Sequence, residues 1–317
     1  MYLYEFFSHA DRFRYRAQII SSATCVFILC TALTLLPPFL LTFYTGDFWI
    51  QESFYSEQPR LANRTKYILL AQNDGIDNRF FTSSYATLNQ NFQGATIPAN
   101  VIQSASDIDG DGLIDQYRIS FDLIFSSNTA TLSSINIWLI FPYELRGRQR
   151  LTMETIALIN IVPPYELTPS ANKNLTVYGQ LIFQQKTAIP NSGSDASYNR
   201  SIIPTDSSLS TPASLDAVLD DYFTRNYYTS YQNQYTWLTS RTTTTDTDRV
   251  TISVVLNSGR QSIRFRPGFW QAIKWGWIQY ISVLLPFLAV FNRLKLFVFS
   301  NQLVRTLVPL TIHRHKA

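Results

Sequence analysis

The sequence predicts two transmembrane α-helices that flank a mainly β, sandwich-like extracytoplasmic domain with one amphipathic helix. Three observations predict this fold class. Two apolar blocks, 19–43 and 269–291, are each long enough to cross a hydrocarbon core of about 30 Å at roughly 1.5 Å per residue. Between them, short runs alternate apolar and polar residues, as strands do. Aromatic residues crowd the ends of the blocks that adjoin this middle region, as is typical of a membrane interface.

The first block begins shortly after Arg12, Arg14 and Arg16, and no Lys or Arg closely follows it. Positive residues collect on the cytoplasmic side of a span, so residues 1–18 are expected to form a cytoplasmic tail. A cleaved signal peptide has an apolar core of roughly 7 to 15 residues, followed by a site of small residues. This block is longer and has no clear site of that kind, so it is predicted to be an uncleaved transmembrane helix over 19–43.

The second block is marked by an aromatic cluster at its beginning, which includes Trp270 and Trp277. Similar rings follow the first block at 43–49. Rings with an apolar body and a polar edge prefer the headgroup zone, so both clusters are expected at the same outer interface. Residues 44–268 are then extracellular or luminal, and 292–317 form a cytoplasmic C-terminal tail.

Acceptor sequons for N-glycosylation support this orientation. They begin at Asn63, Asn174 and Asn199, and all lie between the two blocks. Single sequons also arise by chance in a chain rich in Asn, so they support the orientation without deciding it. The three asparagines are predicted glycosylation sites.

Alternating apolar and polar residues predict several strands in the middle region. The predicted strands are 66–71, 116–125, 134–141, 152–161, 175–184, 250–256 and 261–265. The last two are joined by Asn257, Ser258 and Gly259, which are typical of a hairpin turn because Asn and Gly tolerate positive φ. Many short strands with polar turns indicate a sandwich or an open barrel.

One amphipathic helix is predicted after Pro212. Its apolar face holds Leu215, Val218, Leu219, Tyr222 and Phe223, and its outer face holds Asp216, Asp220 and Asp221. Such a face either packs on a core or binds a partner, and core packing is favoured here.

Composition excludes several classes of function. With 46% hydrophobic and 15% aromatic residues, the chain can bury a sizeable core, so global disorder is excluded. Cys25 and Cys30 both lie in the first block, so the middle domain must fold without disulfides. The only histidines, His9, His313 and His315, lie in the tails, so the domain has no residues for Ser-His, Cys-His or zinc chemistry.

No enzymatic activity is therefore predicted, and a phosphate-binding glycine loop is also missing from the sequence. A membrane-tethered hydrolase with paired carboxylates is the weakest of the open alternatives. Basic residues concentrate from Lys274 onward, outside or near the second block. These charges either set the topology of the spans, which is the favoured interpretation, or contact the lipid bilayer or a cytoplasmic partner. Neither nucleic acid nor a small-molecule substrate is expected.

One acidic segment carries the residues for metal chemistry. Asp107, Asp109, Asp111 and Asp115 occupy relative positions 1, 3, 5 and 9. Calcium prefers six to eight oxygen ligands at roughly 2.3 to 2.6 Å, and alternate carboxylates in a tight loop can supply them. The carbonyl of Leu113 would add a backbone ligand. These five residues are a predicted structural calcium site, with an affinity of about 10⁻⁴ to 10⁻³ M.

Two interpretations of this segment remain open. An EF-hand is disfavoured because Arg118 stands where the bidentate Glu would be, and no flanking helices are apparent. The segment is similar to the short DxDGDGxxD calcium loops at strand ends in integrin-type propellers, and it matches every signature position. The alternative is an acidic hairpin turn, rich in Asp and Gly because turns favour those residues.

Motifs along the whole chain resemble the transmembrane protein 231 family. The similar segments, in order, are 3–9, 15–17, 46–49, 57–59, 107–115, 181–186, 198–201, 267–270, 277–280 and 297–302. Their order and coverage carry the resemblance more than any single motif does. The long Thr- and Ser-rich loops look like a variation particular to this chain.

The resemblance implies a component of the ciliary transition zone. Its family belongs to the Meckel-syndrome complex, beside the tectonics and other membrane proteins. The implied function is a non-enzymatic scaffold in the ciliary membrane that contributes to ciliogenesis and to the diffusion barrier for ciliary membrane proteins. The alternative from the acidic segment is a calcium-dependent adhesion or ligand-binding ectodomain.

Overall fold

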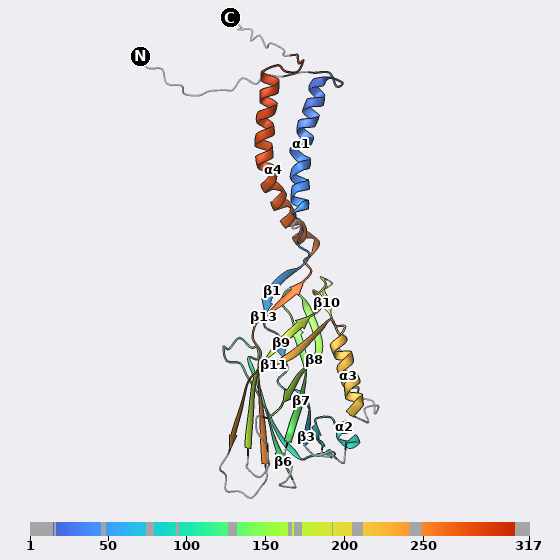
Figure 1. The fold of residues 1–317 in the computed structure, drawn as a ribbon, viewed down its shortest axis with the longest axis vertical. Coiled ribbons are helices and arrows are strands. Elements are labelled where there is room, and N and C mark those ends of the chain that lie inside the picture. Colours follow the sequence, from blue (N-terminus) through green and yellow to red (C-terminus); the bar gives the residue numbers. More distant parts are fainter. Residues whose placement is uncertain are drawn as a thin grey trace, which may run out of the picture. The chain divides into compact units, whose positions relative to one another are not determined.

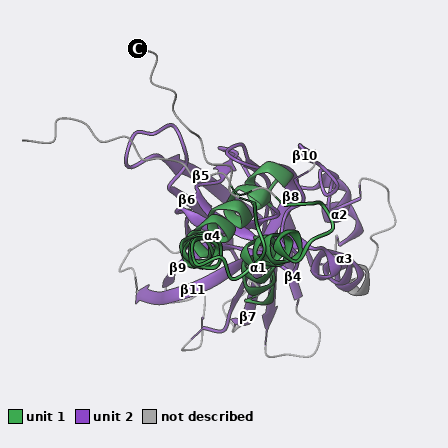
Figure 2. Cartoon of the chain, turned by 90° about the horizontal axis from the view of Figure 1, so that it is seen from above, with its two compact units in different colours: residues 1–51, 267–317 green, residues 52–266 purple. Residues whose placement is uncertain are grey.

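The computed structural model describes residues 15, 17–45, 49–73, 79–92, 95–125, 132–163, 167, 173–191, 193–204, 212–240 and 249–307. The chain divides into two compact units (Figure 2). One comprises Met1–Gln51 with Pro267–Ala317, and the other comprises Glu52–Arg266. Most of the predicted N-terminal tail and the end of the C-terminal tail fall outside the described residues.

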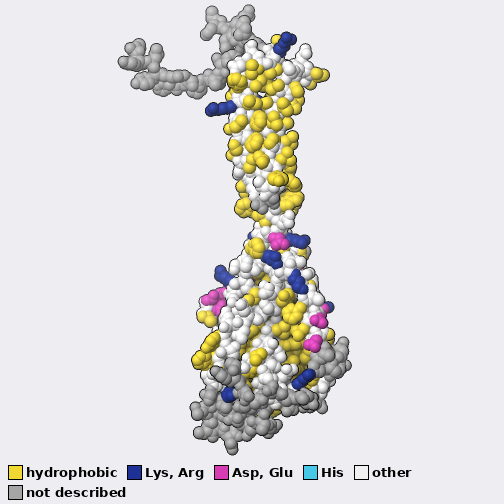
Figure 3. Space-filling model, in the orientation of Figure 1, with side chains coloured by type: hydrophobic (Ala, Val, Ile, Leu, Met, Phe, Trp, Pro, Cys, Tyr) yellow, Lys and Arg dark blue, Asp and Glu magenta, His cyan; other side chains and the backbone are white. Residues whose placement is uncertain are grey.

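The first unit is a pair of helices, α1 (Ser22–Tyr44) and α4 (Phe269–Ser300) (Figure 1). The Ser21 hydroxyl caps α1 by accepting a hydrogen bond from the Thr24 amide at 3.4 Å. Both helices are long and apolar enough to cross a membrane, and apolar side chains cover the face of the pair drawn in Figure 3. The predicted pair of apolar helices is confirmed, although α4 continues past residue 291.

In the part of the second unit that the structure describes, the strands form three sheets. The order of the first is β10 (Ser194–Asp195), β8 (Arg150–Ile161), β7 (Leu132–Leu145), β3 (Lys66–Asn73), β4 (Arg79–Ser83), with β2 (Arg60–Leu61) pairing with β7. The order of the second is β11 (Tyr227–Ser240), β9 (Lys173–Gln185), β12 (Arg249–Asn257), β6 (Gln116–Ile124), β5 (Ala99–Ser106). The third pairs β1 (Ser53–Glu57) with β13 (Gln261–Phe265).

The two larger sheets share one hydrophobic core. Leu69 and Ile137 of the first sheet belong to the same buried cluster as Phe121, Val177 and Ile252 of the second. Side chains of a strand alternate between its faces, so these residues are the inner faces of two packed sheets. The predicted sandwich is therefore confirmed.

A second core covers the opposite face of the first sheet. There Trp138 and Ile140 of β7 pack with Leu88 of α2 (Ala86–Asn91) and with Leu215 and Tyr222 of α3 (Pro212–Thr224). The predicted amphipathic helix is thus α3, and its apolar face packs on the domain. A sheet buried on both faces needs apolar residues at consecutive positions, which explains the unbroken apolar stretch in the middle of β7.

The predicted hairpin at 257–259 is wrong. β12 pairs with β6 on one edge and with β9 on the other, so it has no free edge for β13. β13 leaves the sheet and pairs with β1. At the turn, the Ser258 amide donates a hydrogen bond to the Asp115 carbonyl at 2.7 Å, which directs the chain away from β12.

Candidate metal centre

The acidic segment is the connection between β5 and β6. These strands pair antiparallel, with Ser106 opposite Gln116, and the segment closes the hairpin between them. Gly110 and Gly112 adopt positive φ values of 76° and 82°, which residues with a Cβ rarely tolerate. The alternation of Asp and Gly therefore has a backbone reason as well as a chemical one.

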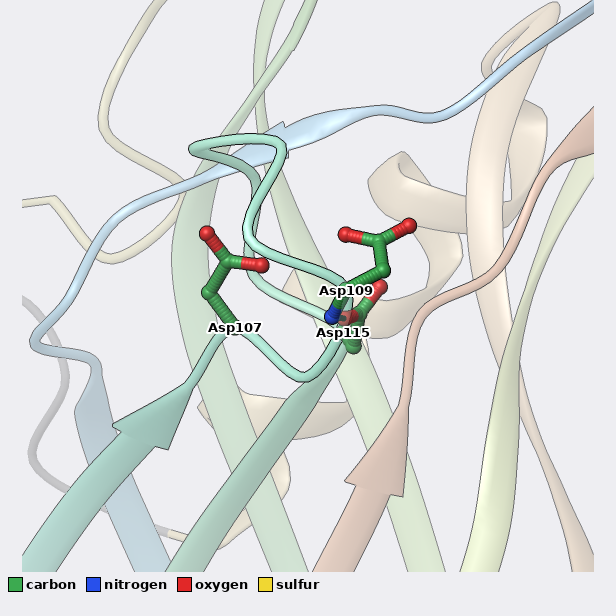
Figure 4. A group of neighbouring side chains, drawn as sticks. All are labelled: Asp107, Asp109 and Asp115. Carbon is green, nitrogen blue, oxygen red and sulfur yellow. Dashed lines mark hydrogen bonds between the residues drawn. The ribbon is translucent and has the colours of Figure 1, made fainter.

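Three of the predicted ligands converge. Asp107, Asp109 and Asp115 can each present one carboxylate oxygen so that the three oxygens lie within 4.8 Å of one another (Figure 4). Oxygens bound to one calcium ion at roughly 2.3 to 2.6 Å have about that spacing, so the donor set fits this cation. Asp111 lies outside the group, and its Oδ1 accepts a hydrogen bond from the Leu113 amide at 2.8 Å.

Backbone amides also hold the segment closed. The Asp107 carboxylate accepts hydrogen bonds from the amides of Gly110 at 2.7 Å and Gly112 at 2.8 Å. The Asp115 carboxylate accepts one from Ile108 at 2.7 Å. An ionised carboxylate has about four lone pairs, so these bonds leave room for a cation. The geometry is compatible with both the calcium loop and the acidic turn.

The pKa values of Asp109 and Asp115 are shifted in opposite directions. The Asp111 amide lowers the pKa of Asp109 by hydrogen bonding, but desolvation and the negative charges of Asp111 and Asp115 outweigh it, so this pKa is raised. The pKa of Asp115 is lowered because the Gln58 side chain and the Ile108 amide donate hydrogen bonds to its carboxylate. A bound cation would offset the repulsion at Asp109.

Gln58 is a contributor that the sequence does not reveal. It follows β1, and its Nε2 donates to Asp115 Oδ1 at 2.9 Å and to the Ser258 carbonyl at 3.4 Å. The contact joins positions far apart in the chain, so no local spacing could have indicated it. It ties the acidic segment to the turn after β12.

The predicted glycosylation sites differ in accessibility. Asn63 and Asn199 are exposed and lie outside the strands. Asn174 lies in β9, is half-buried, and has a buried Oδ1 that finds no hydrogen-bond partner among the described residues. If the domain is exported, Asn63 and Asn199 are the sites that the folded surface leaves open.

A groove on the second core offers little for catalysis. It has a volume of about 510 Å³ and lies between strands of the first sheet and α3. Its lining includes Arg79, Trp138 and Leu219, and one carboxylate, that of Asp216. Paired-carboxylate hydrolysis needs two acids, so this lining does not provide that chemistry.

An apolar helix pair at the ends of the chain and a β-sandwich between them define a transmembrane protein with two spans and a β-rich domain. The family model for transmembrane protein 231 matches residues 1–308, so the chain belongs to the transmembrane protein 231 family.

Curated relatives match over nearly their whole length. Transmembrane protein 231 of Homo sapiens is 32% identical over 314 residues, which cover 98% of this chain and 96% of the relative. Its counterpart in Xenopus tropicalis is 31% identical over 307 residues, which cover 96% of each chain. A cryo-EM structure of a proton-activated chloride channel aligns with 87% of this chain and 97% of its own, at 4% identity and a TM-score of 0.32. Neither fold nor function follows from a likeness that low.

Proposed function

We propose that this protein is a non-enzymatic membrane scaffold of the ciliary transition zone, contributing to the diffusion barrier for ciliary membrane proteins and to ciliogenesis. The observation that carries the proposal is the family match, which spans both helices and the β domain. The partners proposed are the tectonics and other membrane proteins of the Meckel-syndrome complex. The proposed topology places both tails in the cytoplasm and residues 44–268 outside.

The outer face of the second sheet supports a role in protein contacts. Tyr178 of β9 stands opposite Tyr235 of β11, and the Tyr235 ring lies 5.9 Å from that of Trp237. All three side chains are exposed. Exposed Tyr and Trp are enriched in protein interfaces because they bury a large area at little entropic cost.

Loss of the protein is expected to reduce retention of its partners at the transition zone. In ciliated cells that lack the gene, quantitative imaging should show less tectonic signal at the base of the cilium and faster entry of a plasma-membrane reporter. Re-expression of the full chain is the control and should restore both. Unchanged partner signal and unchanged reporter entry in the deleted cells would count against the scaffold.

A structural calcium ion in the acidic segment is a second proposal, favoured by the convergence of Asp107, Asp109 and Asp115. At 10 mM calcium and a Kd of about 1 mM, binding would stabilise the domain by about 1.4 kcal/mol. This corresponds to a rise in Tm of about 3 to 6 °C for a domain of this size. Thermal unfolding of the full chain in detergent, with and without calcium, measures it.

Substitution separates the calcium loop from an acidic turn. Asp107→Ala and Asp109→Ala should each abolish the rise in Tm that calcium causes, because both carboxylates belong to the converging group. Asp220→Asn is the matched control, because Asp220 is an exposed carboxylate on α3, and it should leave the rise unchanged. If calcium at millimolar concentration does not alter the Tm of the unmodified chain, the segment is an acidic turn alone.

A further inference from the structure

A lysine of α4 is turned into the helix pair. Lys295 Nζ donates a hydrogen bond to Thr31 Oγ1 of α1 at 3.2 Å and lies 5.0 Å from the centroid of the Phe27 ring. The side chain is half-buried. The ammonium group is therefore held by α1 but is not fully enclosed.

The helix contacts place this ammonium inside the length of the helix pair, because α4 continues to Ser300 and so carries Lys295 although the predicted span ended at 291. Near one end of the pair, the Tyr280 ring of α4 packs on Phe39 of α1 at 6.4 Å, and near the other the Phe299 ring packs on Tyr15 at 5.8 Å. The helices thus run antiparallel. Thr31 is nine residues into α1, which at about 1.5 Å per residue is roughly 13 Å from the first residue of the helix.

The charge of Lys295 has no acidic counterpart in the sequence of either helix. Neither Ser22–Tyr44 nor Phe269–Ser300 contains Asp or Glu, and none follows α4 through Ala317; Glu5 and Asp11 of the N-terminal tail lie outside the described residues. A hydroxyl and a ring face stabilise an ammonium ion but do not neutralise it. Charged side chains within a membrane normally pair with an opposite charge, and they mark functional contacts.

We propose that Lys295 is the docking point for a transmembrane helix of a partner protein that carries Asp or Glu at the same depth. The inference rests on the proposed scaffold function and adds the chemistry by which a partner is chosen. A lipid phosphate is the less favoured occupant because it lies at the headgroup level, whereas the lysine head group is directed toward Thr31. Arg293, exposed on the same helix, has the charge but not this placement.

The test uses the full-length chain in neutral phosphatidylcholine vesicles. The probe is a synthetic apolar helix with a single Asp near its middle, and energy transfer between the labelled chain and probe measures association. The Asp probe should associate about tenfold more tightly than the same helix with Asn, because the ion pair forms in hydrocarbon. Lys295→Gln should remove this preference, and Lys295→Arg should keep it. Arg293→Gln is the matched control and should have no effect.

A charge-reversal variant distinguishes loss of the ion pair from disruption of the helix pair. The Lys295→Glu variant should no longer bind the Asp probe, and it should bind a probe with a single Lys at the same position. Equal binding of the Asp and Asn probes to the unmodified chain would overturn the proposal. The proposal would also be overturned if the unmodified chain did not bind the Asp probe but bound labelled phosphatidylserine in a way that depends on Lys295. That result would assign the lysine to a lipid headgroup.

This measurement is independent of the transition-zone assignment. If the Asp probe binds through Lys295 but deletion of the gene leaves the tectonics in place, the docking point stands and the proposed function fails. If deletion displaces the tectonics but Lys295→Gln neither displaces them nor weakens the probe, the scaffold stands and the docking point fails.

Discussion

Tyr222→Ala is expected to lower the free energy of unfolding of the β domain by about 4 kcal/mol, the cost typical of removing a large buried ring. Tyr222 is fully buried where α3 meets the first sheet. Its hydroxyl also accepts hydrogen bonds from the amides of Ile156 at 3.2 Å and Thr229 at 2.9 Å, and it lies 2.7 Å from Thr155 Oγ1. One side chain therefore joins α3 to both β8 and β11.

Tyr222→Phe separates the hydroxyl from the ring. It should cost about 1 to 3 kcal/mol, because buried amides lose their acceptor while the ring still fills its place. Urea unfolding of the full chain in detergent, followed by circular dichroism, measures both variants. Tyr235→Phe removes an exposed hydroxyl and is the control, expected within about 0.5 kcal/mol of the unmodified chain. A Tyr222→Phe variant as stable as that control would refute the role of the hydroxyl.

Gly179→Ala is expected to destabilise the domain by about 3 kcal/mol through overpacking. Gly179 lies in β9, opposite the point where β11 has a β-bulge after Asn233. A Cβ at this position would lie 2.3 Å from the Tyr231 ring and 2.5 Å from the Gln232 carbonyl oxygen. The ring could turn aside, but the carbonyl belongs to the backbone, so the strand itself would have to move.

The contribution of Tyr231 to this clash can be isolated. Gly179→Ala combined with Tyr231→Ala should cost less than the sum of the two single changes, since the added methyl group then meets only the carbonyl. Gly259→Ala is the control, because no atom of the described residues beyond its chain neighbours lies within 4 Å of its would-be Cβ, and its φ is not positive. The overpacking account fails if Gly179→Ala unfolds at the same urea concentration as Gly259→Ala.

Sequence periodicity predicted seven of the strands and missed β1, β4, β5 and β11 as well as the shortest ones. Strand β11 was not predicted because it is rich in Tyr, Thr, Gln and Asn and has little contrast between its faces. Short strands such as β2 and β10 hold too few residues to show a period. The turn after β12 was misassigned because local turn chemistry does not tell which edges of a strand are occupied, and that depends on β6 and β9.

In the candidate site too, features that depend on local sequence spacing could be predicted, and features that depend on contacts between distant residues could not. The spacing of Asp107, Asp109 and Asp115 is local, and it predicted a group of carboxylates that the structure brings together. Asp111 fits the spacing equally well but lies outside the group. Gln58 and the contact between Lys295 and Thr31 depend on tertiary packing, so no motif could have indicated them.

The pairing of β1 with β13 has a mechanical consequence. Ser53 stands opposite Phe265, so the polypeptide enters and leaves the β domain at neighbouring positions, only a few residues from each spanning helix. If lateral tension in the bilayer drew the two helices apart, the inter-strand hydrogen bonds would be loaded one residue pair at a time, beginning with the pair Ser53 and Phe265. Bonds loaded in sequence yield at lower force than bonds sheared together, so β1 would peel away from β13, whose Ile263 and Phe265 are anchored in the buried core.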